Sequence, residues 1–314
     1  MRVSPYKIFT YTIVIIAYTV VIYKLIVYNN YANLWFHFTQ NIPSHWFYLL
    51  ICIALMPFNI ITEAVKWKYA ITNIEKISLQ QAILATLKGQ VGAIATPNKL
   101  GDFPTRATSL QPDNRTIGTI MGFVSSWTMS LVIIIIGLLS STIFLSEYHI
   151  DSINNQYLLL TTIICTIAII SIFSIPTISK RINIDKINIH KIKNSLLILS
   201  QVKIKQLITL TSLSTLRYFI FCLQLMFMFF FFDINITTYQ AFISIPMIYL
   251  LSTITPTIVA SEAATRSSYA ILVLSPICSS APTITLATSL LWALNCGIPI
   301  ILGSFLFNKT EKYC

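Results

Sequence analysis

Charged residues are scarce in this chain. Asp, Glu, Lys and Arg make up only 10% of its 314 residues, against about 25% in an average soluble domain. Hydrophobic residues account for 55%, and the mean hydropathy is +0.75. With so few charges a soluble protein could not cover its own surface. The composition therefore excludes an ordinary soluble domain and indicates an integral membrane protein.

The sequence also lacks the motifs of common enzyme and metal chemistries. It contains no C-x-x-C and no H-E-x-x-H, and its six cysteines are scattered, mostly in apolar runs. G-x-S-x-G, Walker and Rossmann glycine patterns are absent as well. We therefore expect no catalytic residue, no metal and no cofactor, and we expect the cysteines to be reduced packing residues.

Basic residues outnumber acidic ones by 21 to 10, and they are unevenly placed. Loops at 147–156 and around 233 contain none. Clusters of basic residues are typical of cytoplasmic loops near anionic lipid, and they do not require a nucleic-acid partner. We expect a multi-pass protein of the cell (cytoplasmic) membrane with both termini cytoplasmic. The basic clusters lie at 2–7, 66–115, 180–205 and 309–312. The segment 180–205 is either a positive cytoplasmic loop or an interfacial helix on anionic lipid.

Six apolar segments are long enough to span a bilayer. The first is too long for a signal peptide and is followed by no small-residue cleavage site, so we expect it to remain as a span. We predict one membrane domain over 1–314, with halves at about 1–150 and 157–314. The expected spans are 8–28, 46–65, 116–146, 157–178, 207–232 and 283–307.

One motif occurs twice, once in each half. Residues 77–106 read ISLQQAILATLKGQVGAIATPNKLGDFPTR, and residues 236–266 read ITTYQAFISIPMIYLLSTITPTIVASEAATR. Both contain Gln-Ala, then Thr-Pro, then an acid with an Arg four residues after it. The first copy has Gln81-Ala82, Thr96-Pro97, Asp102 and Arg106, and the second has Gln240-Ala241, Thr255-Pro256, Glu262 and Arg266.

Thr-Pro predicts a helix break in each copy, because Pro removes a backbone donor and disfavours helix in the residue before it. All basic clusters fall on the cytoplasmic side only if each motif copy enters the membrane and returns to the side from which it started. We therefore predict an all-α integral membrane protein with about six full spans and two Pro-broken re-entrant helical segments. The copies start from opposite sides, so they form an inverted repeat.

The acid and the Arg of each copy are neighbours on a helix face. A charged group at membrane depth costs about 2.5–3.5 kcal/mol on insertion scales, so such residues usually mark a path or a site. Because the planar guanidinium binds phosphate oxygens bidentately, Arg106 and Arg266 predict a headgroup site. Asp102 and Glu262 would orient them or take up protons. The alternative is that each pair neutralises itself and only fixes helix packing.

Two lysines within the first copy, Lys88 and Lys99, are further candidates. Lys88 lies in an apolar stretch next to Gly89, where it either lines a polar cavity or snorkels to the interface. Helices that begin after the Thr-Pro breaks would also direct backbone amides at an anion. The candidate substrate-binding residues are Lys88, Thr96, Pro97, Lys99, Asp102, Arg106, Thr255, Pro256, Glu262 and Arg266.

These residues resemble a known pattern. Thr96-Pro97-Asn98-Lys99-Leu100-Gly101-Asp102 with Arg106, followed by Pro256, Glu262 and Arg266, is similar to the flippase-like transmembrane region of lysylphosphatidylglycerol synthases. That family also contains stand-alone membrane proteins. The resemblance covers about 45–305. It departs at Asp102, where the family often has Glu, and at Ser261, where it often has Gly.

The resemblance implies a function in lipid translocation. The aminoacyl-transferring part of full synthases is a separate soluble domain, and we expect none here. The expected function is thus translocation or handling of an anionic lipid, or of a lipid-linked headgroup, between leaflets. Two alternatives stay open. One is a membrane-embedded enzyme acting on lipid phosphates, and the other is a non-catalytic partner of a separate lipid or envelope biosynthetic enzyme.

Overall fold

The computed structural model describes residues 31–94, 96–148, 155–181, 199–278 and 280–310. These residues form helices with no strand among them, which confirms the expected all-α class. The predicted span 8–28 and most of the basic segment 180–205 lie outside the described residues. The helices are α2 (Tyr31–Ala70), α3 (Leu79–Ala93), α4 (Asp102–Ala107), α5 (Arg115–Glu147), α6 (Asn155–Phe173), α7 (Ile175–Arg181), α9 (Ile204–Phe231), α10 (Thr238–Ile254), α11 (Val259–Leu274), α12 (Ala281–Trp292) and α13 (Ile298–Thr310).

Among the described residues, four helical stretches are long and apolar enough to cross a membrane. They match four of the expected spans and are consistent with a multi-pass membrane protein. The expected span 157–178 forms a shorter apolar helix, Tyr157–Phe173, followed by α7. The four stretches are His45–Ala70, Pro112–Glu147, Ile204–Phe231 and Ala281–Phe305.

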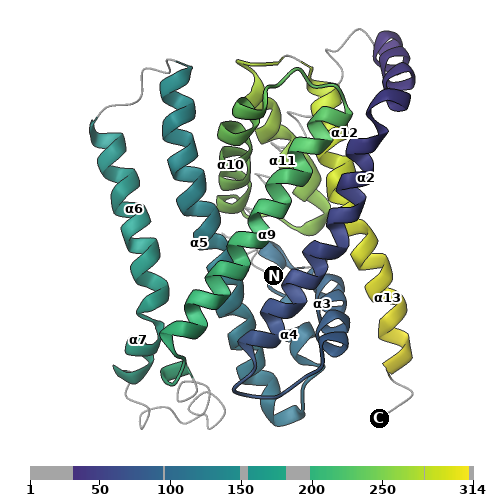
Figure 1. Cartoon of the computed structure of the whole chain (residues 1–314). Coiled ribbons are helices and arrows are strands. Elements are labelled where there is room, and N and C mark those ends of the chain that lie inside the picture. The colour runs from purple at the N-terminus through teal and green to yellow at the C-terminus, as the bar shows by residue number, and fades with distance from the viewer. Residues whose placement is uncertain (1–30, 95, 149–154, 182–198, 279, 311–314) are drawn as a thin grey trace, which may run out of the picture.

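The long helices surround the two motif copies (Figure 1). Helix α2 packs along α9, and α5 packs against α10. Helix α6 lies at one edge of the molecule beyond α5, and α13 lies at the other edge against α3. The first copy, α3 and α4, lies toward one end of the long helices, and the second copy, α10 and α11, lies toward the other. The copies therefore approach the middle of the molecule from its two ends.

Each copy begins with the same N-terminal cap. The Ser78 hydroxyl accepts from the Gln81 backbone N–H at 3.2 Å, and the Gln81 side chain accepts from the Ser78 N–H at 2.8 Å. Thr237 and Gln240 repeat this arrangement at 3.2 and 2.9 Å. This reciprocal pair is a capping box. The repeated Gln is therefore a helix-start signal.

Both copies break at Thr-Pro, as predicted. Helix α3 ends at Ala93 and α4 begins at Asp102, while α10 ends at Ile254 and α11 begins at Val259. The first break contains a 3-10 turn, η1 (Pro97–Lys99), in which Asn98 and Lys99 have positive φ angles of 50° and 58°. The two breaks contact each other. The Asn98 N–H donates to the Thr257 carbonyl at 2.8 Å, and the Thr257 N–H donates to Asn98 Oδ1 at 3.0 Å.

Glycines allow α3 to lie directly against α4. A Cβ at Gly89 would stand 1.9 Å from Asp102 Oδ1, and one at Gly92 would stand 1.9 Å from Thr105 Oγ1. A side chain at either position would force the facing residues of α4 to shift. This close approach buries Asp102 and Arg106 on the inner face of α4.

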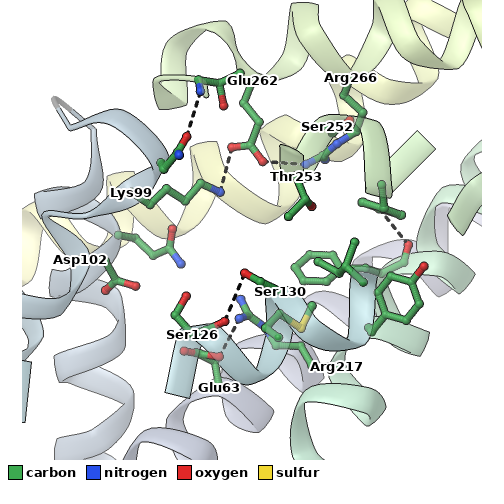
Figure 2. A pocket seen from close by; sticks show the side chains of 18 of the residues that line it. Glu63, Lys99, Asp102, Ser126, Ser130, Arg217, Ser252, Thr253, Glu262 and Arg266 are labelled. Atoms are coloured by element: carbon green, nitrogen blue, oxygen red, sulfur yellow. Dashed lines mark hydrogen bonds and ion pairs between the residues drawn. The ribbon is translucent and has the colours of Figure 1, made fainter. Parts of the chain in front are cut away.

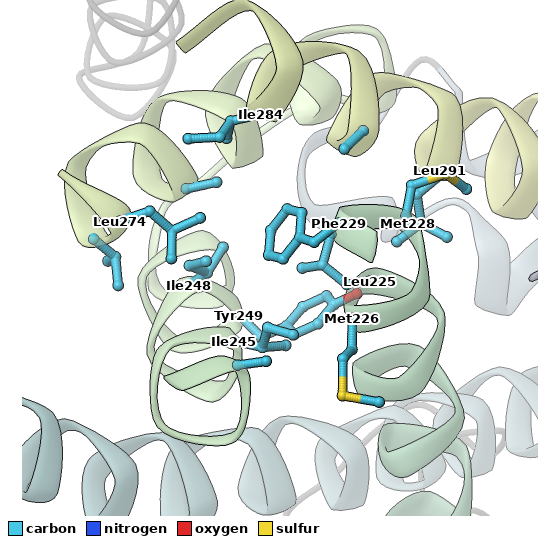
Figure 3. Packing of buried hydrophobic residues seen from close by; sticks show 14 of the residues in the cluster. Leu225, Met226, Met228, Phe229, Ile245, Ile248, Tyr249, Leu274, Ile284 and Leu291 are labelled. Carbon is cyan, nitrogen blue, oxygen red and sulfur yellow. The ribbon is translucent and has the colours of Figure 1, made fainter. Parts of the chain in front are cut away.

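The second copy is anchored in an apolar core (Figure 3). Buried side chains of α9, α10, α11 and α12 interlock there, and Tyr249 extends from this core toward the polar centre of the molecule. The labelled members are Leu225, Met226, Met228, Phe229, Ile245, Ile248, Tyr249, Leu274, Ile284 and Leu291. This packing holds the acid and the Arg of α11 on a rigid base.

Candidate functional site

A cavity of about 300 Å³ lies between the two motif copies (Figure 2). Side chains from α2, α3, α4, α5, α9, α10 and α11 line it, together with the two breaks. Its charged lining consists of five basic residues, Lys66, Lys99, Arg106, Arg217 and Arg266, and three acidic ones, Glu63, Asp102 and Glu262. These eight residues form two clusters, one for each copy.

The first cluster, here called the Glu63 cluster, consists of Glu63, Lys66, Asp102, Arg106 and Arg217. Arg106 donates to Glu63 Oε1 at 2.6 Å through Nη1, and it binds both carboxylate oxygens of Asp102 through Nε and Nη2. The second oxygen of Glu63 accepts from Arg217 at 2.6 Å and pairs with Lys66 at 3.1 Å. Glu63 thus joins three cations from three helices.

Uncharged groups complete the bonding of the Glu63 cluster. Arg217 Nε donates to Asn59 Oδ1 at 2.7 Å, and Lys66 Nζ donates to the Ser214 hydroxyl at 3.4 Å. The guanidinium of Arg106 also lies over the ring of Trp67 at 5.7 Å. Buried charges are stable only when paired and hydrogen-bonded, and this cluster meets that condition.

The second cluster, here called the Glu262 cluster, consists of Lys99, Glu262 and Arg266. Arg266 Nη2 donates to Glu262 Oε1 at 2.6 Å, and Lys99 Nζ pairs with Glu262 Oε2 at 2.8 Å. Lys99 belongs to the first copy, so this ion pair crosses between the copies (Figure 2). The Cys296 sulfur lies 3.7 Å from Lys99 Nζ and 3.9 Å from Glu262 Oε2.

The two arginines of the motif differ in how fully they are bonded. All three guanidinium nitrogens of Arg106 have carboxylate partners. The Nε–H of Arg266 is buried and has no hydrogen-bond partner within the described residues. Its guanidinium lies 5.2 Å from the centre of the Tyr249 ring, which supports its plane.

The rest of the cavity wall combines hydroxyl groups with apolar side chains, among them Met129, Ile133 and Phe221. Hydroxyl groups of α5 and α10 face the cavity, and Figure 2 shows them between the Glu63 and Glu262 sides. A hydroxyl both donates and accepts, so it adapts to an anionic or a neutral polar ligand. These residues are Ser126, Ser130, Ser252 and Thr253.

With all eight groups ionised, the cavity carries two more positive than negative charges. Each cluster contributes one of the two, because the Glu63 cluster has three bases and two acids, and the Glu262 cluster has two bases and one acid. Excess charge is costly in a low-dielectric interior unless a counter-charge offsets it. The arrangement therefore favours an anion in the cavity.

The structure brings together six of the ten candidate residues as cavity lining: Lys99, Asp102, Arg106, Thr255, Glu262 and Arg266. Lys88, Thr96, Pro97 and Pro256 do not line it. The Thr96 hydroxyl accepts from the Gly101 N–H at 2.8 Å, and the Thr255 hydroxyl donates to the Leu251 carbonyl at 2.8 Å. Both threonines thus stabilise the helix breaks.

Glu63, Lys66 and Arg217 were not in the candidate set, although they form most of the Glu63 cluster. Their signal is present in the sequence, since each is an ionisable residue inside an apolar span. Cys296, which lies beside Lys99 and Glu262, carried no such signal. It lies in a five-residue π-helical segment, η4 (Ala293–Gly297), which the sequence pattern did not predict.

Comparison with known proteins identifies no relative that would assign a function to the site. No family model matches the chain, and no curated protein matches it significantly. The resemblance to the synthase region accordingly remains a prediction. Among the described residues, no group of three or more His, Cys, Asp and Glu is placed to hold a metal.

Proposed function

We propose that this protein translocates an anionic lipid, or a lipid-linked headgroup, between membrane leaflets. The observation that carries the proposal is the cavity between the motif copies in a chain of membrane-spanning character. It is lined by five basic and three acidic side chains, which gives an excess of positive charge when all are ionised. An anionic headgroup would offset that charge and find arginine, lysine and hydroxyl donors around it. A neutral headgroup would leave the charge uncompensated.

A neighbouring apolar pocket favours a lipid over a free anion. This pocket, of about 370 Å³, is lined by α5, α9 and α10, and it shares Tyr218 with the polar cavity. Phe219 and Phe242 at its edge are about half exposed on the outer face of the helices. A molecule with an anionic head and a hydrocarbon chain fits adjoining polar and apolar pockets, because each part avoids a desolvation cost.

The same proposal includes an inverted repeat with six full spans, two re-entrant segments and cytoplasmic termini. Asn98 and Thr257 occupy the same position in the two copies, directly after Thr-Pro, and they hydrogen-bond to each other. A contact between equivalent positions is what a two-fold relation produces. Movement of one copy against the other would then open the cavity to alternate sides.

The test is translocation by the purified protein in vesicles that contain fluorescent phosphatidylglycerol, followed by chemical quenching of the outer leaflet. Arg106→Ala and Arg266→Ala are each expected to abolish translocation above the protein-free rate. Arg115→Ala is the matched control, since Arg115 lies at the start of α5 and does not line the cavity. Undiminished translocation in both folded cavity variants would overturn the proposal.

The two alternative functions are outcomes of the same experiment. Conversion of the labelled lipid to a new product would identify an enzyme acting on lipid phosphates. Absence of both translocation and product, with stable co-purification of a lipid or envelope biosynthetic enzyme, would identify a non-catalytic partner. Either result replaces the proposed function.

A further inference from the structure

The two clusters of the cavity differ in the number of carboxylates around the motif arginine. In the Glu63 cluster, Glu63 and Asp102 together occupy every nitrogen of Arg106. In the Glu262 cluster, Glu262 alone serves both Arg266 and Lys99. Arg266 therefore retains a buried Nε–H without a hydrogen-bond partner in the described part of the chain. A buried donor left in this way is costly unless a ligand supplies the acceptor.

The missing carboxylate can be located by comparing α2 with α9. Lys66-Trp67 on α2 corresponds to Arg217-Tyr218 on α9, as a base followed by a buried aromatic residue. Three residues before each base stand Glu63 on α2 and Ser214 on α9. The contacts agree with this correspondence, because Glu63 bonds to Arg217 while Ser214 bonds to Lys66. The second half thus has a hydroxyl where the first half has an acid.

We propose that the cavity binds a phosphate group of its ligand at Arg266 and Lys99. The phosphate supplies the second anion that Glu63 supplies to Arg106, and it accepts from the Arg266 Nε–H, the donor that Asp102 binds in Arg106. Arg106 is then a positioning residue that holds the first copy in place. This inference rests on the proposed function and names the part of the cavity that recognises the anion.

The chemistry of the Glu262 cluster fits a phosphate. A guanidinium presents a planar set of donors that matches two phosphate oxygens, and a lysine adds a mobile point charge. The Tyr249 ring holds the guanidinium plane, while the Lys99 side chain is 37% exposed and can follow the ligand. Arg106, with a side chain only 4% exposed, already donates to a carboxylate from each of its three nitrogens.

The experiment measures binding by isothermal titration with the full chain in lipid nanodiscs of neutral lipid. Two probes are used: inorganic phosphate and dihexanoyl phosphatidylglycerol. Arg266→Lys and Lys99→Gln are expected to weaken binding of the tighter probe about tenfold or more, because each removes a charge-assisted hydrogen bond. Arg106→Lys is expected to weaken it less than threefold, while lowering the unfolding temperature more than either of the other variants.

If Arg266→Lys fails to fold, Lys99→Gln still tests the phosphate site. Lys99 lies outside the α-helices and is partly exposed, so its replacement should leave the fold intact. Equal loss of binding in the Arg106 and Arg266 variants would overturn the inference, as would unchanged binding in Lys99→Gln. Tighter binding of the lipid than of phosphate assigns the site to a headgroup, and equal or tighter binding of inorganic phosphate assigns it to the free anion.

The inference and the proposed function fail separately. Binding with the expected order of variants, but without translocation in vesicles, supports the phosphate site and overturns transport. Translocation by the unaltered protein, together with equal loss of phosphate binding in Arg106→Lys and Arg266→Lys, supports transport and overturns the assignment of the phosphate to Arg266 and Lys99.

Discussion

The two motif copies place an acid and an Arg four residues apart on a short helix, yet they surround the Arg differently. Arg106 is enclosed by two carboxylates from its own half of the chain. Arg266 shares one carboxylate with a lysine that comes from the other copy. The repeated string thus specifies the helix start, the break and the acid–Arg pair. Residues outside the string differ between the halves: Glu63 on α2 binds Arg106, whereas the equivalent Ser214 on α9 supplies no carboxylate to Arg266, whose Nε–H has no partner in the described residues.

The largest effect in this comparison is expected from Glu63→Gln. The change removes the carboxylate that joins Lys66, Arg106 and Arg217, and leaving buried charges unpaired costs about 3–5 kcal/mol. Thermal unfolding in detergent should show this loss. Glu147→Gln, at the exposed end of α5, is the matched control and should change the unfolding temperature little. Similar stability of the two variants would mean that the Glu63 cluster does not hold the first copy.

A smaller effect is expected from Gly89→Ala. The new Cβ would stand 1.9 Å from Asp102 Oδ1, and forcing a side chain into a packed interface costs about 1–3 kcal/mol. The variant should lose both stability and translocation, because Asp102 and Arg106 must shift. Gly297→Ala is the control, since its Cβ would meet only the Ala293 Cβ, at 3.9 Å. Equal unfolding temperatures for the two variants would contradict the tight α3–α4 contact.

Glu262→Gln tests the second cluster directly. Loss of this carboxylate frees Lys99 and Arg266, so a bound phosphate no longer competes with Glu262 for these two cations. Phosphate affinity should rise by about 1 kcal/mol, or about fivefold, as expected for a partly exposed ion pair. Titration of the variant beside the unaltered protein measures the difference. A fall in affinity would mean that Glu262 is needed to orient Arg266.

The smallest effects are expected from the two capping-box glutamines, and Gln240→Ala should cost slightly more because Gln240 Nε2 also donates to the Tyr148 hydroxyl at 3.2 Å. Gln81→Ala and Gln240→Ala each remove the side chain that accepts from the first residue of a capping box. Each should lower stability by about 0.5 kcal/mol, the low end for a single hydrogen bond. Paired thermal unfolding measurements provide the check. A larger loss of stability in Gln81→Ala than in Gln240→Ala would contradict the contribution of the Tyr148 contact.

Much of this arrangement follows from local sequence. Thr-Pro predicts both breaks, because proline acts on its immediate neighbours, and an acid–Arg spacing of four predicts the pairs 102–106 and 262–266. Five of the six cavity-lining candidates follow from these two patterns: Asp102, Arg106, Thr255, Glu262 and Arg266.

The remaining contacts depend on packing between distant segments. Nothing near Glu63 in the sequence indicates that its partners would be Arg106 and Arg217. The same holds for Lys99, which pairs with Glu262 only because the two breaks meet. Thr96 and Pro97 were expected at the site on the strength of their repetition, but repetition equally marks residues that shape a turn.

The π-helical segment η4 fixes the rotation of the last helix. Such a segment contains one residue more than regular α geometry, and each residue turns the helix by about 100°. In this rotation Gly303 of α13 meets α3, where a Cβ would stand 2.3 Å from the Leu87 carbonyl. Deleting one residue within 293–297 would turn Gly303 away and bring a larger side chain against α3. The extra residue of η4 thus determines how closely α13 approaches the first motif copy.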